Sequence, residues 1–221
     1  MYTRSAEEIY STSEGFSEDR NGDLRQFQFQ YIERDLLQTQ LVGEHLLPFL
    51  GSTRFEWKGT LSESGRDEPD NRQLEYLRSP NGSRYGLGNN SDVWFRTLRD
   101  RQYAAQADLL VPIRLFGSSF AFKAGGMMRS KVRAFDAKLV SFNPRTGNDV
   151  PDDLVYLPPE LLFTPENVGS YLNLTFPGQV AQPYDADETL MAAYGMLDLQ
   201  ISRLRIVAGA RMEDWSIDLF D

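Results

Sequence analysis

The chain has 221 residues, a formal net charge of -9 and no cysteine. Its length allows a single domain, and its acidic balance argues against nucleic acid as a partner, because nucleic-acid binding depends on Lys and Arg that neutralise phosphates. Without Cys the chain can form no disulfide, no zinc–thiolate site and no thiol nucleophile.

The mean hydropathy is low, at -0.45, and no run of residues approaches the roughly 18 apolar residues of a membrane-spanning helix. A transmembrane β-barrel places its apolar residues at every second position, so the average along its chain stays polar. Low hydropathy therefore does not exclude a membrane protein that crosses the bilayer with strands.

The first 22 residues are polar, and we predict a loop there. Residues 1–8 contain no apolar segment of the kind that forms a secretory signal, so a membrane barrel with this beginning would be a fragment. Between 24 and 31, Phe27, Phe29 and Tyr31 alternate with glutamines. This stretch is either an extension of the next strand or a separate strand.

Six stretches alternate with period two and predict β-strands. They lie near 36–46, 54–62, 102–114, 119–134, 188–197 and 203–215. In most of them an apolar face opposes a face that holds charges, which is typical of a strand between lipid and a polar lumen. We expect the lipid-facing side chains to include Val111, Phe120, Phe122, Leu204 and Ile206. In 188–197 we place Leu190, Ala192, Tyr194 and Met196 on one face, opposite small residues.

The connections between these strands alternate in length. The connections at 47–53, 115–119 and 198–203 are short, whereas 63–100 and 135–187 are long, polar and rich in Gly, Pro, Asn and Asp. Outer-membrane barrels have short periplasmic turns and long extracellular loops, whereas a soluble antiparallel sandwich has more evenly spaced turns. We therefore predict an all-β fold, an antiparallel meander of about six long strands that forms part of a transmembrane β-barrel.

Several segments resemble one family when they are taken in order. They are Tyr31-Ile32-Glu33-Arg34-Asp35-Leu36-Leu37, Gln40-Leu41-Val42-Gly43-Glu44-His45, Phe55-Glu56-Trp57, Glu68-Pro69-Asp70-Asn71-Arg72, Ala192-Ala193-Tyr194-Gly195-Met196 and Leu204-Arg205-Ile206-Val207-Ala208-Gly209-Ala210-Arg211-Met212-Glu213. Together they resemble the barrel sequence of TonB-dependent outer-membrane receptors, and the resemblance covers most of the chain from 26 to 213.

The resemblance implies a barrel of about twenty-two strands with a plug domain, located in the outer membrane of a Gram-negative bacterium. It also implies TonB-coupled uptake of a siderophore, glycan or similar small-molecule nutrient. The partners would be outer-membrane lipid, the remainder of the barrel, the plug domain and, through the plug, TonB. The chain has no plug-like region, so we expect 1–221 to be a fragment of the barrel.

The sequence offers little catalytic chemistry, and we predict no enzyme, no cofactor and no metal centre. His45 is the only histidine, and a lone histidine more often has a structural hydrogen bond than a catalytic role. Two acidic runs could gather Ca²⁺, but solvated loop acids are the more common explanation. These runs are Asp149, Asp152 and Asp153, and Asp185, Asp187 and Glu188.

Charges on the predicted lumen face and aromatic residues in the predicted loops are the functional candidates. The lumen-facing candidates are Lys123, Arg129, Lys131, Arg133, Arg205, Arg211 and Glu213. They would pair with one another across strands, contact a plug domain or guide an anionic ligand. The candidates for contact with a ligand are Tyr76, Tyr85, Trp94, Tyr156 and Tyr171.

Three other classes of protein remain open. A passive porin-type barrel would share the strand pattern. A soluble β-sheet binding module would bury the apolar face of 120–132 against a second sheet. A barrel enzyme of the phospholipase type would need a Ser-His pair that includes His45.

Overall fold

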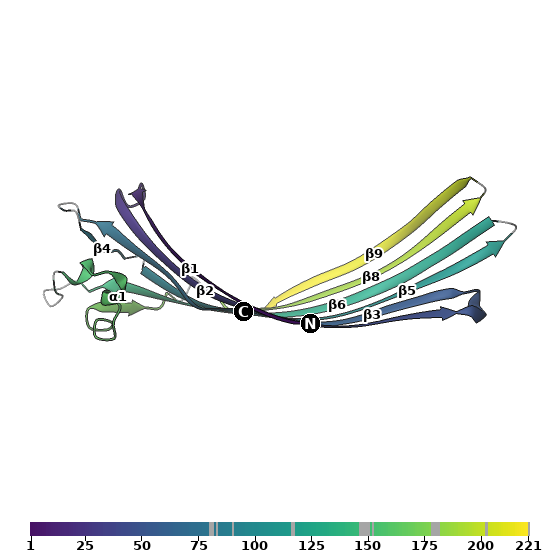
Figure 1. The fold of residues 1–221 in the computed structure, drawn as a ribbon, viewed down its shortest axis with the longest axis horizontal. Coiled ribbons are helices and arrows are strands. Elements are labelled where there is room, and N and C mark those ends of the chain that lie inside the picture. The colour runs from purple at the N-terminus through teal and green to yellow at the C-terminus, as the bar shows by residue number, and fades with distance from the viewer. Residues whose placement is uncertain are drawn as a thin grey trace.

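The computed structural model describes residues 1–79, 82, 84–89, 91–115, 118–145, 151, 153–177, 182–201 and 203–220. Within these residues, nine strands form one antiparallel sheet that is not closed on itself (Figure 1). The strands are β1 Tyr2–Ser17, β2 Gly22–Leu47, β3 Thr53–Arg78, β4 Tyr85–Leu87, β5 Ser91–Leu115, β6 Ser118–Pro144, β7 Leu172–Thr175, β8 Tyr184–Ile201 and β9 Leu204–Phe220. The prediction of an all-β antiparallel fold is confirmed, with nine strands instead of about six.

Consecutive long strands are neighbours in the sheet, in the order β1-β2-β3-β5-β6-β8-β9, while β4 pairs with β3 and β7 pairs with β6. The strands of the pairs β2 and β3, β5 and β6, and β8 and β9 meet at one end of the sheet, which we call the hairpin end (Figure 1, right). The opposite end, which we call the loop end, carries β4 and the helix α1, Pro159–Leu162 (Figure 1, left).

The helices of the described residues are short. Besides α1, two 3₁₀ turns lie at Pro48–Leu50 and Leu154–Tyr156. No helix among the described residues is long and apolar enough to cross a membrane.

The N-terminal prediction is wrong, because residues 2–17 form strand β1 instead of a loop. Tyr2 pairs with Leu37 and Ser17 with Gly22, so that β1 lies beside the loop-end half of β2 over its whole length. Both faces of β1 are largely polar, and backbone pairing replaces apolar alternation as the source of its order. The open question about residues 24–31 is settled as well, since they belong to β2 and extend it toward the loop end.

The two long predicted loops are mostly strand. Of 63–100, β3 takes the residues up to Arg78 and β5 takes those from Ser91 onward. Of 135–187, β6 continues to Pro144 and β8 begins at Tyr184. At the hairpin end, β8 runs on to Ile201, so the predicted turn 198–203 shortens. Strands outside the alternating region were missed because both of their faces carry polar side chains.

The register assigns every side chain of the central sheet to one of two faces, since residues paired across strands project from the same face. Val111 pairs with Phe122, Phe122 with Leu197, and Leu197 with Ala208, and we call this side the band face. The next row along the strands lies on the opposite side, which we call the charged face. This row contains Leu110, Lys123, Met196 and Gly209.

The register also resolves the ambiguous strand at 188–197. Leu190, Ala192, Tyr194 and Met196 lie on the charged face, because Tyr194 pairs with Arg211 and Ala192 with Glu213. Their small opposite neighbours are on the band face. Residue type alone would have suggested the reverse assignment.

Buried apolar side chains gather at the loop end. Leu74, Tyr76 and Leu87 from the sheet pack with Leu154, Leu162 and Leu172 from the segment between β6 and β8. This segment covers one end of the sheet and forms a small core there. By contrast, the hairpin-end half of the band face has no buried apolar side chain among the described residues.

Candidate functional site

The band face carries a continuous belt of uncharged side chains across six strands, which we call the band. It comprises the alternate residues from Thr39 to Leu47, Thr53 to Leu61, Tyr103 to Ile113, Phe120 to Ser130, Thr189 to Ile201 and Leu204 to Met212. The residues predicted to face lipid lie in it. Because each strand contributes the same face over its hairpin-end half, the band runs without interruption from β2 to β9.

The width of the band matches a bilayer. On β5 it spans 103–113, which is ten residue steps, or about 33 Å along the strand at roughly 3.3 Å per residue. A strand tilted by about 40–45° converts this length into a height of about 25 Å, which is the height of the apolar belt of outer-membrane barrels.

Most side chains of the band are exposed or half-buried, with Thr53 as a buried exception. Leu41 is 66% exposed, Met128 53% and Ile206 46%, although all three lie in the interior of long strands. A large contiguous apolar surface of this kind is unfavourable in water, since each Å² removed from water contributes about 25 cal/mol. The fold therefore leaves the band to be covered by something outside the described residues.

A row of charges borders the band on its loop-end side. Leu37, Glu63, Arg101, Val132 and Asp187 are paired consecutively across the sheet, so the first charges of β3, β5 and β8 stand at the same row. The carboxylate of Glu63 lies 2.7 Å from the guanidinium of Arg101. On these three strands the change from uncharged to charged side chains takes a single row, whereas on β9 the first charge, Asp214, pairs with Met191 of the band.

His45 lies near the hairpin end of the band, where it has a structural environment. The indole Nε1 of Trp57 donates a hydrogen bond to Nε2 of His45 at 3.1 Å, and the imidazole stacks on Phe55 at 6.2 Å between ring centroids. Nε2 of His45 therefore accepts a hydrogen bond within the sheet. This geometry agrees with the structural role predicted for the residue.

All seven lumen-facing candidates lie on the charged face, on the odd positions of β6 and β9. Most of them pair with neighbouring carboxylates, as barrel-interior charges commonly do. The pairs are Arg129–Glu188 at 2.5 Å, Lys131–Asp100 at 3.1 Å, Arg133–Asp100 at 2.7 Å, Arg205–Asp198 at 2.5 Å and Arg211–Glu213 at 2.5 Å. Mutual pairing is thus the main role that the geometry assigns to these charges.

Lys123 belongs to a different arrangement that crosses three strands. Tyr194 on β8 lies across Gly125 on β6 and donates its hydroxyl to the carboxylate of Asp108 on β5. A side chain at position 125 would clash with both partners. The ammonium of Lys123 lies 5.8 Å from the centroid of the Tyr194 ring, so the ring also meets a cation.

The structure brings together four of the five aromatic residues predicted to contact a ligand, at the loop end. Tyr76 is in β3 and not in a loop, and it is 2% exposed. Its hydroxyl donates to the backbone oxygen of Leu157 at 3.0 Å, and burial raises its pKa. Tyr85, in β4, and Tyr171 pack against the same small core, while the ring of Tyr156 lies against Gly86.

Tyr85 also ties β4 to β1. Its hydroxyl donates to Glu14 at 2.5 Å, and the guanidinium of Arg25 lies 4.3 Å from the centroid of its ring. The hydrogen bond from Tyr85, followed by that from Arg25, lowers the pKa of the Glu14 carboxyl. These contacts make the loop-end aromatics parts of the fold.

Trp94 lies apart from these four residues. It is in β5, not in a loop, and the guanidinium of Arg96 lies 4.4 Å from the centroid of its ring. The same Arg96 approaches Glu68 at 3.5 Å, and Arg66 approaches that carboxylate at 2.6 Å. Sequence reasoning missed Arg66, Glu68 and Arg96 because they fell in a predicted loop, where facing could not be assigned.

Among the acidic residues considered for Ca²⁺, those that the structure describes do not form a cluster. Asp149 and Asp152 lie outside the described residues, and Asp153 pairs with Arg84 at 2.6 Å. Asp185 and Asp187 lie on the band face of β8 beyond the band, whereas Glu188 is on the charged face. Among the described residues no three acidic or histidine side chains are placed to hold a metal ion.

No protein-family model matches the chain, and no curated protein is similar to it at a significant level. The function must therefore be inferred from the faces of the sheet and from the residues that they bring together.

Proposed function

We propose that the chain forms part of the wall and loop end of an outer-membrane β-barrel, with the band against lipid and the charged face toward the interior. The observation that carries this proposal is the uncharged band, about 25 Å high, on one face of six consecutive strands. A bilayer is the partner that covers such a belt on every strand at once.

The opposite face supports the same orientation. The interior of a barrel is polar, and the charged face holds ion pairs that join neighbouring strands, such as Arg133 with Asp100 and Arg205 with Asp198. In the hydrocarbon of a membrane these groups would be strongly disfavoured. Their pairing within the sheet suits an interior with limited water.

The sheet edges explain how the wall would continue. β1 and β9 are the outermost strands, and each pairs on one side only within the described residues. A barrel abolishes such edges because further strands pair with them. We infer that additional strands complete the ring around the charged face.

Among the classes of outer-membrane barrel, the order of the segments that resemble TonB-dependent receptors favours a receptor of that kind. Such a protein would take up a siderophore, glycan or similar nutrient across the outer membrane of a Gram-negative bacterium. Its partners would be a plug domain within the barrel and, through it, TonB. A passive porin would share the band and the charged face, and a plug domain in the same polypeptide would distinguish the receptor.

A soluble binding module requires a second layer over Phe120, Phe122 and their neighbours. In the part of the chain that the structure describes, the only covering segment lies at the loop end, over Leu74 and Tyr76, and not over the band. The band therefore favours lipid over a second sheet.

The absence of Cys allows a direct test of the facing. Single cysteines at Leu197 and Met196, which are adjacent on β8 and project from opposite faces, would be labelled with bimane in protein reconstituted into vesicles. Brominated lipid should quench the label at 197 strongly and the label at 196 weakly. Equal quenching of the two labels would contradict the proposed orientation.

A further inference from the structure

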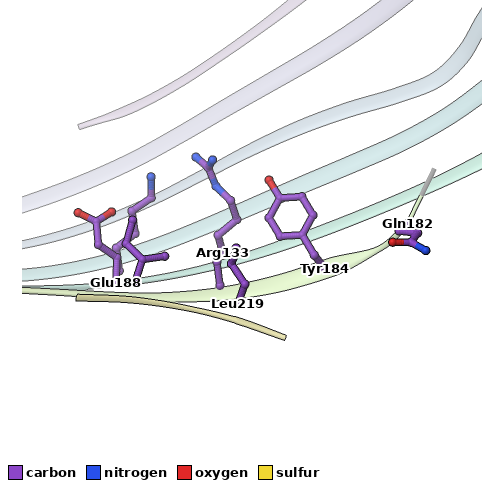
Figure 2. Close-up of a pocket in the computed structure, with 8 residues that line it drawn as sticks. Arg133, Gln182, Tyr184, Glu188 and Leu219 are labelled. Carbon is purple, nitrogen blue, oxygen red and sulfur yellow. The ribbon is translucent and has the colours of Figure 1, made fainter. Parts of the chain in front are cut away.

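The charged face carries a second feature just beyond the band, where two cavities of about 560 and 500 Å³ adjoin through Gln182. The first is lined by Lys131, Arg133, Tyr184 and Glu188, and Figure 2 shows Arg133, Tyr184 and Glu188 rising from the same side of the sheet. The second is lined by Trp94, Arg66 and Arg96, among others. Together they form one groove across β3, β5, β6, β8 and β9.

The register explains why these residues meet. Four successive rows of the charged face cross the sheet here, beginning with Glu68, Arg66, Ser64 and Ser62 on β3. The second row continues through Leu98 and Phe135 to Tyr184, and the third continues through Asp100 and Arg133 to Ala186. Strand pairing therefore fixes the groove, apart from Gln182, which precedes β8.

The charge of the groove is positive, although the chain as a whole carries -9. Glu68 is shared by Arg66 and Arg96, and Asp100 is shared by Lys131 and Arg133. Each of the two carboxylates thus pairs with two cations. The cluster around Glu68 and the cluster around Asp100 therefore each carry one surplus positive charge. Arg129 and Glu188 balance each other nearby.

Aromatic rings provide flat apolar surface in the groove beside these two clusters. The rings of Phe135 and Tyr184 pack at 5.3 Å between centroids, and Trp94 presents an indole at the other end of the groove. Aromatic faces of this kind bind the apolar faces of rings, and arginines bind carboxylates through charge-assisted hydrogen bonds.

We propose that this groove binds an elongated anionic ligand in which ring faces alternate with carboxylates, such as an acidic oligosaccharide. One carboxylate would meet the surplus charge beside Glu68 and another the surplus charge beside Asp100. The sugar rings would lie on Trp94 and on the Phe135–Tyr184 pair. This assignment rests on the proposed function, because it requires the charged face to line an interior open to nutrients.

The test uses the full chain in detergent micelles and trigalacturonate as the probe, with binding followed by titration calorimetry. Maltotriose, which has the same number of rings and no carboxylate, should bind at least about tenfold more weakly, since charge-assisted hydrogen bonds contribute that much or more. Citrate, which has carboxylates and no rings, should also bind more weakly. Equal affinity for either control, or no binding of trigalacturonate, would overturn the proposal.

A pair of arginines on β5 provides the matched variants. Arg96→Gln removes a cation from the groove and should weaken trigalacturonate binding by about tenfold or more. Arg101→Gln removes the same charge from the other face, where Arg101 pairs with Glu63, and should leave the affinity within about twofold. Equal losses in both variants would mean that net charge alone attracts the probe.

Failure of this inference is distinguishable from failure of the proposed function. The bimane labels at 196 and 197 report the facing of the sheet without any ligand. Unequal quenching together with no trigalacturonate binding would reject the groove alone, whereas equal quenching would reject the barrel wall itself.

Discussion

Trp57 and Gly43 face each other across β2 and β3 on the band face, and the indole lies over the glycine while it donates to His45. A Cβ at position 43 would clash with the indole ring, so the hydrogen bond at 3.1 Å depends on the missing side chain. Tyr194 uses Gly125 in the same way on the charged face. Aromatic rings that cover strand glycines are thus a repeated device for fixing neighbouring strands.

We expect Gly43→Ala to displace the Trp57 indole and to lower the free energy of unfolding by about 1–3 kcal/mol, as overpacking does elsewhere. Gly59 is the control, because it lies on the same face and a Cβ there would meet nothing within 4 Å. Gly59→Ala should be neutral or stabilising by up to about 1 kcal/mol. Guanidinium unfolding in detergent, followed by Trp fluorescence, measures both. Equal effects would show that the indole does not lie where the structure places it.

The link between Glu14 and Tyr85 predicts a pH dependence at the loop end. The folded-state pKa of Glu14 lies below its ordinary value, so this contact contributes to stability above the ordinary carboxyl range and is lost as the pH falls through the lowered pKa. We expect Tyr85→Phe to raise the pKa of Glu14 toward the ordinary range, because the hydrogen bond is the largest cause of the shift. Carboxyl carbon NMR titration measures this pKa.

Tyr10 is the control for that titration, since it lies on the same strand as Glu14 and is 63% exposed. Tyr10→Phe should leave the pKa of Glu14 unchanged. An unshifted Glu14 in Tyr85→Phe would contradict the contact between β1 and β4.

The small core at the loop end should depend on Leu162, which is fully buried in α1. Leu162→Ala removes buried methyl groups and should lower the stability of the loop-end segment by about 2–5 kcal/mol. The adjacent Leu161 is 57% exposed, and Leu161→Ala should change the stability of this segment by less than about 0.5 kcal/mol. Hydrogen exchange of the amides in 153–175 reports both values. Similar protection in the two variants would mean that this segment does not pack on the sheet.

The alternating half of this fold could be predicted from the sequence, and the other half could not. Phe120 and Phe122 signal a strand because one face meets a uniform environment, which forces a strict period of two. Beyond the charged row neither face is uniform, so Arg96, Arg66 and the whole of β1 carry no periodic signal. Their strands are extended by backbone pairing with neighbours that the sequence does not reveal.

The candidate site shows the same division. The seven lumen-facing charges were found because they alternate with apolar residues, and the structure places them together on one face. Trp94 was singled out as an aromatic, but its cations Arg66 and Arg96 were not, since their facing depends on the register of β3 with β5. Tyr76 was predicted to contact a ligand because its neighbours Glu75 and Leu77 do not reveal its burial. Leu162 and Leu172, which are distant in sequence, pack against it.

The proposed orientation predicts which end of the sheet faces the cell exterior. A cysteine at Leu161, at the loop end, should react with a membrane-impermeant maleimide on intact cells that express the complete protein. A cysteine at Phe49, which is 78% exposed at the hairpin end, should react only after the outer membrane is permeabilised. The opposite labelling would invert the topology.

The facing of β9 tests the central claim most directly, because Ala208 and Val207 are adjacent and project from opposite faces. Ala208 is the middle residue of the band on β9, whereas Val207 pairs with Asp198 on the charged face. We expect Ala208→Arg to destabilise the protein folded in a bilayer by about 2–4 kcal/mol, and Val207→Arg to change its stability by less than about 1 kcal/mol. Equal folding of the two variants in lipid vesicles would contradict a lipid-facing band.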